Sequence, residues 1–203
     1  EELMLEDYSK KEAQSEVNAS IDRIVYYAGW CDKFNQVASS VNPVSSSHFN
    51  FSSHEPMGVV GIMAKDSSGL LGLVSMLMPV IAGGNSSVLI ASENKPLCAV
   101  TFAEVLNSSD VPGGVVNILT GSIDELWSPI SSHMDVNGIS MEKSNKYVSD
   151  VQLASVDNLK RVRIYSNDFD LSQEQGIQFI TDFQELKTTW HPIEKIGGAS
   201  SSY

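Results

Sequence analysis

The chain has 203 residues, of which 42% are hydrophobic and 19% are charged, a composition typical of a globular protein. Its formal net charge is -12, and an acidic surface repels phosphate backbones, so the sequence argues against nucleic-acid binding. The acidic N-terminus lacks the apolar core of a signal peptide, and the longest apolar run, 70–82, is too short to span a bilayer. We therefore expect a cytoplasmic protein without a membrane segment.

The thiols and imidazoles give no pattern typical of a metal site. Cys31 and Cys98 form no spaced framework, which predicts reduced thiols. The four histidines are scattered, so we expect no bound metal. Cys98 opens a predicted helix, where a thiol pKa can fall. No base stands near it in sequence, so an ordinary buried cysteine is the favoured interpretation.

Helical periodicity is the first structural pattern along the chain, over residues 13–38. Apolar residues recur there every three to four positions and predict one buried stripe. The stripe consists of Val17, Ile21, Ile24, Val25 and Ala28. Residues 39–53 are rich in Ser and Asn and contain a proline, which predicts a loop or an edge strand.

From residue 58 onward, strand-like and helical segments alternate. Short apolar runs predict strands at 58–63, 88–91, 115–119 and 138–141. Helices are predicted between them at 69–82, 97–106 and 123–131. Strands separated by helix-length segments form βαβ units with a parallel sheet. The sequence therefore predicts an α/β fold, a Rossmann-like open parallel sheet with helices on both faces.

The last third of the chain has a different composition. Residues 143–157 are polar, with scattered apolar positions and no predicted element. A strand is predicted at 162–165, and a helix capped by Ser172 is predicted to run to about residue 183. Residues 186–191 alternate as a final strand, which places Leu186, Thr188 and Trp190 on one face. The small polar tail that follows is expected to be flexible.

Four motifs, in order, resemble the aldehyde dehydrogenase family. They are YYAGWCDK at 26–33, EPMGVVG at 55–61, IAGGN at 81–85 and VPGGVVNILTG at 111–121. The resemblance covers roughly residues 21–144 and implies the fold of that family's NAD-binding domain. In addition, ELKTTWHP at 185–192 resembles the C-terminal strand that family members use in oligomer contacts.

The departures from the family pattern fall on positions that handle substrate and cofactor. Ser67 stands where the resemblance implies an oxyanion-holding Asn, and losing such a donor costs roughly a hundredfold in rate. Ile90 replaces a Lys that contacts the cofactor ribose, whereas Glu93 matches the ribose-contacting Glu. Glu142 and Lys143 bring charge and bulk to a turn where small residues admit the pyrophosphate.

The family's nucleophilic Cys and general-base Glu belong to regions without a counterpart here. We therefore predict a degenerate, truncated member of the NAD(P)-dependent family, a pseudoenzyme without catalytic residues. No bound cofactor is expected, with Glu93 as a vestigial contact. The predicted role is that of a structural or regulatory subunit. Its expected partners are a second copy or a full-length aldehyde dehydrogenase, contacted through Leu186, Thr188 and Trp190.

Two alternatives remain open from the sequence. The chain could be a weak NAD-binding module that relies on Glu93, or a residual aldehyde oxidoreductase component completed by a partner's catalytic domain. The predicted organisation has three segments. They are a degenerate NAD-binding-type domain at 1–144, a connecting segment with a strand and a helix at 145–184, and a C-terminal oligomerisation strand with its tail at 185–203.

Overall fold

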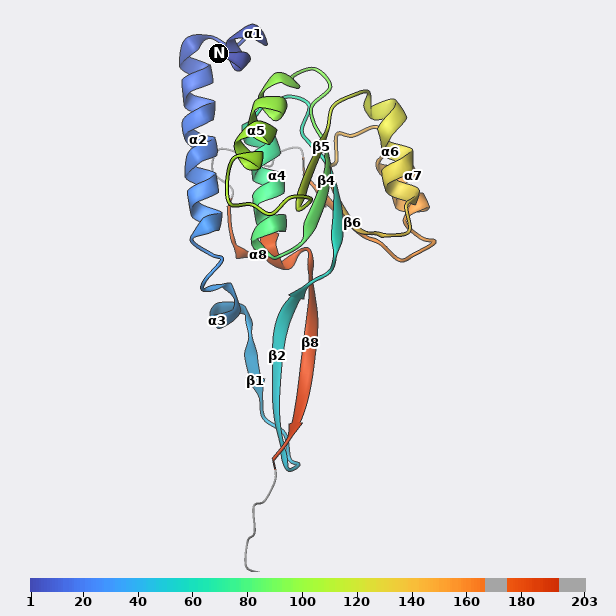
Figure 1. The fold of residues 1–203 in the computed structure, drawn as a ribbon. Coiled ribbons are helices and arrows are strands. Elements are labelled where there is room, and N and C mark those ends of the chain that lie inside the picture. The colour runs from blue at the N-terminus through green and yellow to red at the C-terminus, as the bar shows by residue number, and fades with distance from the viewer. Residues whose placement is uncertain (167–174, 194–203) are drawn as a thin grey trace, which may run out of the picture.

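A computed structural model describes residues 1–166 and 175–193, which form an α/β body with a projecting β-arm (Figure 1). The body contains five parallel strands in the order β5-β4-β3-β6-β7. They are β3 (Val59–Met63), β4 (Ser86–Ile90), β5 (Val116–Leu119), β6 (Val136–Glu142) and β7 (Arg161–Tyr165). The winding direction reverses between β3 and β6, which is the switch point of a doubly wound sheet. The predicted Rossmann-like fold is confirmed.

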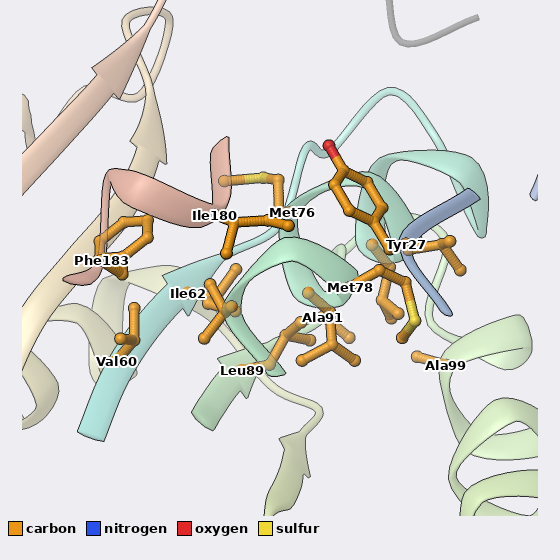
Figure 2. Packing of buried hydrophobic residues seen from close by; sticks show 14 of the residues in the cluster. Tyr27, Val60, Ile62, Met76, Met78, Leu89, Ala91, Ala99, Ile180 and Phe183 are labelled. Carbon is orange, nitrogen blue, oxygen red and sulfur yellow. The ribbon is translucent and has the colours of Figure 1, made fainter. Parts of the chain in front are cut away.

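Helices cover both faces of this sheet. One face packs against α4 (Leu71–Ala82) and α5 (Leu97–Asn107), and α2 (Lys10–Ala28) and α8 (Ile177–Thr181) pack on α4. Figure 2 shows Ile62 and Leu89 from the strands packed among Tyr27 of α2, Met78 of α4 and Ile180 of α8. The other face packs against α6 (Ile123–Ser132) and α7 (Val148–Ala154). Alternate strand residues enter the two cores, since successive side chains point to opposite faces.

The GVVG motif serves packing. Gly58 has φ +127°, a left-handed conformation that favours glycine. A Cβ on Gly61 would lie 2.6 Å from Ile130 Cγ2, so glycine allows α6 to approach β3 closely. Backbone geometry explains the glycine at position 58, and close packing explains the glycine at position 61.

The prediction for the first long helix was wrong in two respects. The helix α2 ends at Ala28, and a turn separates it from α3 (Phe34–Ala38). Ile21 and Val25 of the predicted buried stripe are 52% and 65% exposed. The buried positions of α2 are Ala13, Ser20, Arg23 and Tyr27. The face of α2 that is buried is the one that packs against α4. On this face, Arg23 donates a hydrogen bond to Ser75 Oγ of α4 at 2.9 Å.

The arm is a three-stranded antiparallel sheet in the order β1-β2-β8. Its strands are β1 (Ser40–Asn42), β2 (His48–Pro56) and β8 (Gln184–Pro192). Residues 39–53, predicted to be a loop or an edge strand, supply the edge strand β1 and most of the central strand β2, and the predicted final strand forms as β8. Polar side chains hold the arm together. Asn42 Nδ2 donates to Asn50 Oδ1 at 2.7 Å and to Ser52 Oγ at 2.8 Å. Ser52 Oγ in turn lies 2.8 Å from Thr188 Oγ1.

The predicted connecting segment, 145–184, packs with the body. It contributes α7, which the sequence did not predict, and Val151 anchors that helix with 0% exposure. Strand β7 pairs with β6, and Ile180 lies in the main core. Ser172, the predicted cap, and the tail from 194 lie outside the described residues. The boundaries at 144 and 184 stay a prediction.

Asn85 joins three parts of the fold. Its side chain is 1% exposed, and Oδ1 accepts a hydrogen bond from Gly58 N at 3.0 Å. The amide Nδ2 donates to Phe183 O at 2.9 Å and to Val80 O at 3.3 Å. Asn85 therefore links the start of β3 and the end of α4 with the junction between α8 and β8.

We expect Asn85→Ala to lower the free energy of unfolding by about 2–4 kcal/mol, because buried backbone groups lose their partners. Urea denaturation would measure this change. The matched control is Asn107→Ala, at an exposed position at the end of α5. A loss at position 85 no larger than the control's would contradict the linking role.

Candidate functional site

A pocket of about 400 Å³ opens at the carboxyl ends of β3, β4 and β6. Ligands of open α/β sheets bind at this place, next to the switch point. Met63, Ile90 and Glu142, which end these strands, line the pocket, and Glu93 and Lys146 line it from the following loops. We therefore take this carboxyl-edge pocket as the candidate functional site.

An ion pair spans the switch point. Glu142 ends β6 with 8% exposure, and its Oε1 lies 3.0 Å from Nζ of Lys65, which follows β3. The other carboxylate oxygen accepts a hydrogen bond from Ser144 Oγ at 3.2 Å. The sequence predicted charge and bulk in the turn at Glu142 and Lys143. In the structure, the Glu142 carboxylate of this turn is buried and pairs with Lys65 just after the end of β3.

The first turn of α4 is capped by a carboxylate from α2. Glu16 Oε1 accepts hydrogen bonds from Leu70 N at 2.8 Å, Leu71 N at 3.0 Å and Ser68 Oγ at 2.9 Å. Ser68 Oγ accepts from Gly72 N at 2.7 Å. Helix N-termini carry partial positive charge and orphan N–H groups, so this is where an anionic ligand would otherwise bind.

The next two helices that begin at this edge are capped in the same way. Glu6 Oε1 accepts from Leu97 N, at the start of α5, at 2.7 Å. Glu93 Oε2 accepts from Ile123 N at 3.1 Å and from Ser122 Oγ at 3.4 Å, at the start of α6. We call Glu6, Glu16 and Glu93 the three glutamate caps. Each supplies a carboxylate to a helix start that is distant in sequence.

Asp66 connects the loops after β3 and β4. Its carboxylate accepts hydrogen bonds from Ser92 Oγ at 2.8 Å, from Asn94 N at 3.2 Å and from the Asn94 side-chain amide. Burial alone would raise the pKa of Asp66, but the hydrogen bonds from Ser92 and Asn94 outweigh it and hold the pKa below its usual value. The ionised form of Asp66 therefore stabilises the pocket wall.

The predicted site residues do not gather around one point. Ile90 and Glu93 line the pocket, but Ile90 is 2% exposed and Glu93 binds the start of α6. Ser67 is exposed, and its backbone oxygen accepts from Lys95 Nζ at 3.4 Å. Lys143 is also exposed, and its backbone N–H donates to Tyr165 O at 2.8 Å.

On the arm, the three predicted contact residues share one face of β8. Leu186, Thr188 and Trp190 pair in register with His54, Ser52 and Asn50 of β2. Leu186 is 61% exposed and Trp190 is 56% exposed. The Trp190 ring stands edge-on to His48, with ring centroids 5.8 Å apart.

Cys98 has the environment of a structural residue. Burial, with the carboxylates of Glu6 and Glu2 nearby, raises the pKa of its thiol to about 11. The thiol is therefore neutral near pH 7 and a poor nucleophile, which agrees with the sequence interpretation. Within 1–166 and 175–193, no group of three or more His, Cys, Asp or Glu side chains could hold a metal ion.

Sequence reasoning missed Glu6, Glu16 and Lys65. Glu6 and the helix start that it caps are 91 positions apart in sequence, and Glu16 and its helix start are 54–55 positions apart. No local sequence pattern could therefore predict these contacts. From sequence alone, a single Glu on an amphipathic helix is expected to be exposed to solvent. The polar segment before α4 was the available signal, because Ser68 precedes a helix start whose N-cap residue, Leu70, has no capping side chain.

The open parallel sheet and the pocket at its switch point are the arrangement of a Rossmann-like α/β domain. The model of the Aldehyde dehydrogenase family matches residues 5–165. Omega-crystallin of Enteroctopus dofleini is 33% identical over 152 residues, which cover 74% of this chain and 30% of that protein. The mitochondrial aldehyde dehydrogenase of Sus scrofa is 35% identical over 140 residues, which cover 68% of this chain and 26% of that protein.

Solved structures of the same family are also similar to this chain. The NAD+ complex of an aldehyde dehydrogenase from Bacillus cereus matches with a TM-score of 0.69 and 26% identity, over 74% of this chain and 30% of that one. The chain belongs to the aldehyde dehydrogenase family. It spans about 30% of the length of the relatives it matches. In its described part, no helix is long and apolar enough to cross a membrane.

Glu16→Ala should lower the free energy of unfolding by about 1–3 kcal/mol, since the first turn of α4 and Ser68 lose their shared acceptor. Equilibrium urea denaturation checks the value. Glu104→Ala, an exposed position within α5, is the matched control and should change stability by less than about 0.5 kcal/mol. Equal effects at both positions would show that the cap is unimportant.

Asp66 predicts a specific pH dependence. Because its folded pKa lies below the ordinary value of 3.8, its stabilisation is present above that value and is lost as the pH falls through the folded pKa. Unfolding midpoints should therefore fall more steeply with acidification in the wild type than in Asp66→Asn. Asp110→Asn, on an exposed turn, should follow the wild-type curve. Parallel curves for all three proteins would contradict the assignment.

Proposed function

We propose that this chain is a non-catalytic member of the aldehyde dehydrogenase family that acts as a structural or regulatory subunit. It would do so by adding β8 to the sheet of a neighbouring chain. The observation that carries this proposal is the edge position of β8. The strand pairs with β2 along its whole length, and its other edge pairs with no strand of the described chain.

The side chains of β8 favour pairing of its free edge with another chain. Edge strands of monomeric proteins are commonly blunted by charged residues, prolines or bulges. Lys187 of β8 is neutralised by Glu55, with Nζ 2.7 Å from Oε1. On the opposite face of the strand, Leu186 and Trp190 are 61% and 56% exposed. An exposed strand edge with large apolar side chains supports pairing with a second chain, either another copy or a full-length relative.

The residues at the carboxyl edge do not fit the phosphates of the family's cofactor. A bound pyrophosphate would take N–H donors at a helix N-terminus. The three glutamate caps already accept from the starts of α4, α5 and α6. Glu142 adds a further carboxylate at the switch point. Because Glu142 lies in the turn where the family resemblance places the pyrophosphate, we propose that no cofactor is bound in the family's manner, and we derive no reaction step through it.

The proposed absence of catalysis has separate support. Ser67 offers no side-chain amide at the position that the family resemblance assigns to the oxyanion donor. The Cys98 thiol is buried and neutral near pH 7.

A weak NAD-binding module is the second candidate function. The pocket of about 400 Å³ at the switch point favours it, together with Glu93 on its wall. A residual aldehyde oxidoreductase component, completed by a partner's catalytic domain, stays a third hypothesis. Such a component would have to bind its cofactor in the same pocket.

The subunit role predicts association through β8. Multi-angle light scattering of the chain, alone and mixed with a full-length aldehyde dehydrogenase from its host, should show a complex. The double variant Leu186→Ser/Trp190→Ser should weaken that complex at least tenfold and leave the unfolding midpoint unchanged, because both side chains are exposed. Val25→Ser, 65% exposed on α2, is the control. A chain that stays monomeric with every partner, or a complex that the double variant leaves intact, would refute the role.

A further inference from the structure

A pocket of about 250 Å³ opens at the amino edge of the sheet, where α2 and α4 end and β5 begins. Ala28, Cys31 and Pro112 are exposed at its mouth. Tyr27 and Met78 form its floor and are 1% and 6% exposed, and Figure 2 shows both among the core residues. We call this cavity the amino-edge pocket. It lies at the opposite end of the sheet from the carboxyl-edge pocket.

The turn before β5 supplies the outer wall of the amino-edge pocket. This turn belongs to the VPGGVVNILTG motif, which the fold and the proposed function have not otherwise explained. Val115 N donates to Pro112 O at 3.2 Å, and Gly114 has φ +86°, a left-handed conformation that favours glycine. Val111, Pro112 and Val115 line the pocket from this turn, and Ile81 lines it from α4. The outer wall is therefore a hydrogen-bonded turn with apolar side chains.

The whole lining of the pocket is apolar. Among the described residues that line it, none is charged, and only Tyr27 and Cys31 carry a polar side-chain atom. The hydroxyl of Tyr27 is already hydrogen-bonded to the backbone of Gly176. Water is held poorly in such a place, because an ordered water needs about two to four polar partners. An apolar group that displaced this water would be stabilised by its burial.

The volume and the surrounding charge restrict the ligand. The volume of about 250 Å³ lies just below the range of roughly 300–1,000 Å³ that is typical of small-molecule sites, so few atoms fit. Asp32 and Asp110 are exposed, and each is next to a lining residue in sequence. Lys33 lies over the Trp30 ring, with Nζ 5.1 Å from the centroid. With a net charge of -12, the chain disfavours an anionic group at this mouth.

The Cys31 thiol can report on occupancy of the pocket. Its Sγ donates a hydrogen bond to Tyr27 O at 3.6 Å, which places the sulfur at the end of α2. The thiol is free and exposed. Cys98, the other thiol of the chain, is buried, and its pKa of about 11 keeps it neutral near pH 7. A reagent that alkylates thiols should therefore react at Cys31, and a ligand at the mouth should slow this reaction.

We propose that the amino-edge pocket binds a small neutral molecule with an alkyl chain, of the kind represented by a medium-chain alcohol. The alkyl chain would lie against Met78 and Ile81, and its polar end would stay in water beside Cys31. The flexible thioether of Met78 lets the floor adjust to the chain. Neither β8 nor the carboxyl edge contributes to this pocket, so the inference goes beyond the proposed subunit role and does not depend on it.

The test measures how fast iodoacetamide alkylates Cys31, followed by intact mass, with octan-1-ol as the ligand probe. Octan-1-ol should slow alkylation of the wild type saturably, by about threefold or more, and should raise the unfolding midpoint. Ala28→Phe places a ring at the exposed mouth and should abolish both effects. Ile21→Phe, at a position 52% exposed on the same helix, is the matched control and should respond as the wild type does. Octanoate should protect at least fivefold less well.

Three results would overturn the proposal. The first is a wild type whose alkylation rate and unfolding midpoint do not change with octan-1-ol. The second is equal protection in the wild type and in Ala28→Phe, which would assign the effect to the reagent or to binding elsewhere. The third is protection by octanoate as strong as that by octan-1-ol, which would contradict the neutral ligand. The Leu186→Ser/Trp190→Ser variant should respond to octan-1-ol normally, so failure here is distinct from failure of the β8 role.

Discussion

The rest of the structure depends on carboxylates bound to helix N-termini at the carboxyl edge of the sheet. An α/β sheet collects the positive ends of its helices at this edge, which makes it a natural anion site. Here Glu6, Glu16 and Glu93 accept hydrogen bonds from the starts of α5, α4 and α6. Two of these glutamates come from the N-terminal segment. The contacts that dock this segment on the body are therefore also contacts of the helix starts at this edge.

The two ends of the sheet consequently differ in character. At the carboxyl edge, polar groups are engaged with one another, and the Lys65–Glu142 pair spans the switch point. At the opposite end, the arm departs and large apolar side chains stand exposed, among them Trp190 and Leu186. The proposed function follows this contrast. Binding by this chain is assigned to its surfaces and not to the crevice that the fold ordinarily uses.

The sequence predicted the body well because its strands are buried apolar runs that periodicity detects directly. It failed where polar contacts decided the outcome. The buried face of α2 follows the Arg23–Ser75 hydrogen bond and not the row that contains Ile21 and Val25. The helix α7 was missed because one residue, Val151, carries its burial. Glu93 was expected to be a vestigial ribose contact, and its bond to Ile123 N could not be read from a local pattern.

Isothermal titration of the purified chain with NAD tests the central claim most directly, namely that this chain fills its own cofactor edge. The account predicts no saturable heat up to millimolar NAD. It also predicts that NAD does not raise the unfolding midpoint, because a ligand that binds only the folded state would raise it. Saturable binding with a dissociation constant in the micromolar range would contradict the account. That result would make the chain a nucleotide-binding module and the three glutamate caps displaceable.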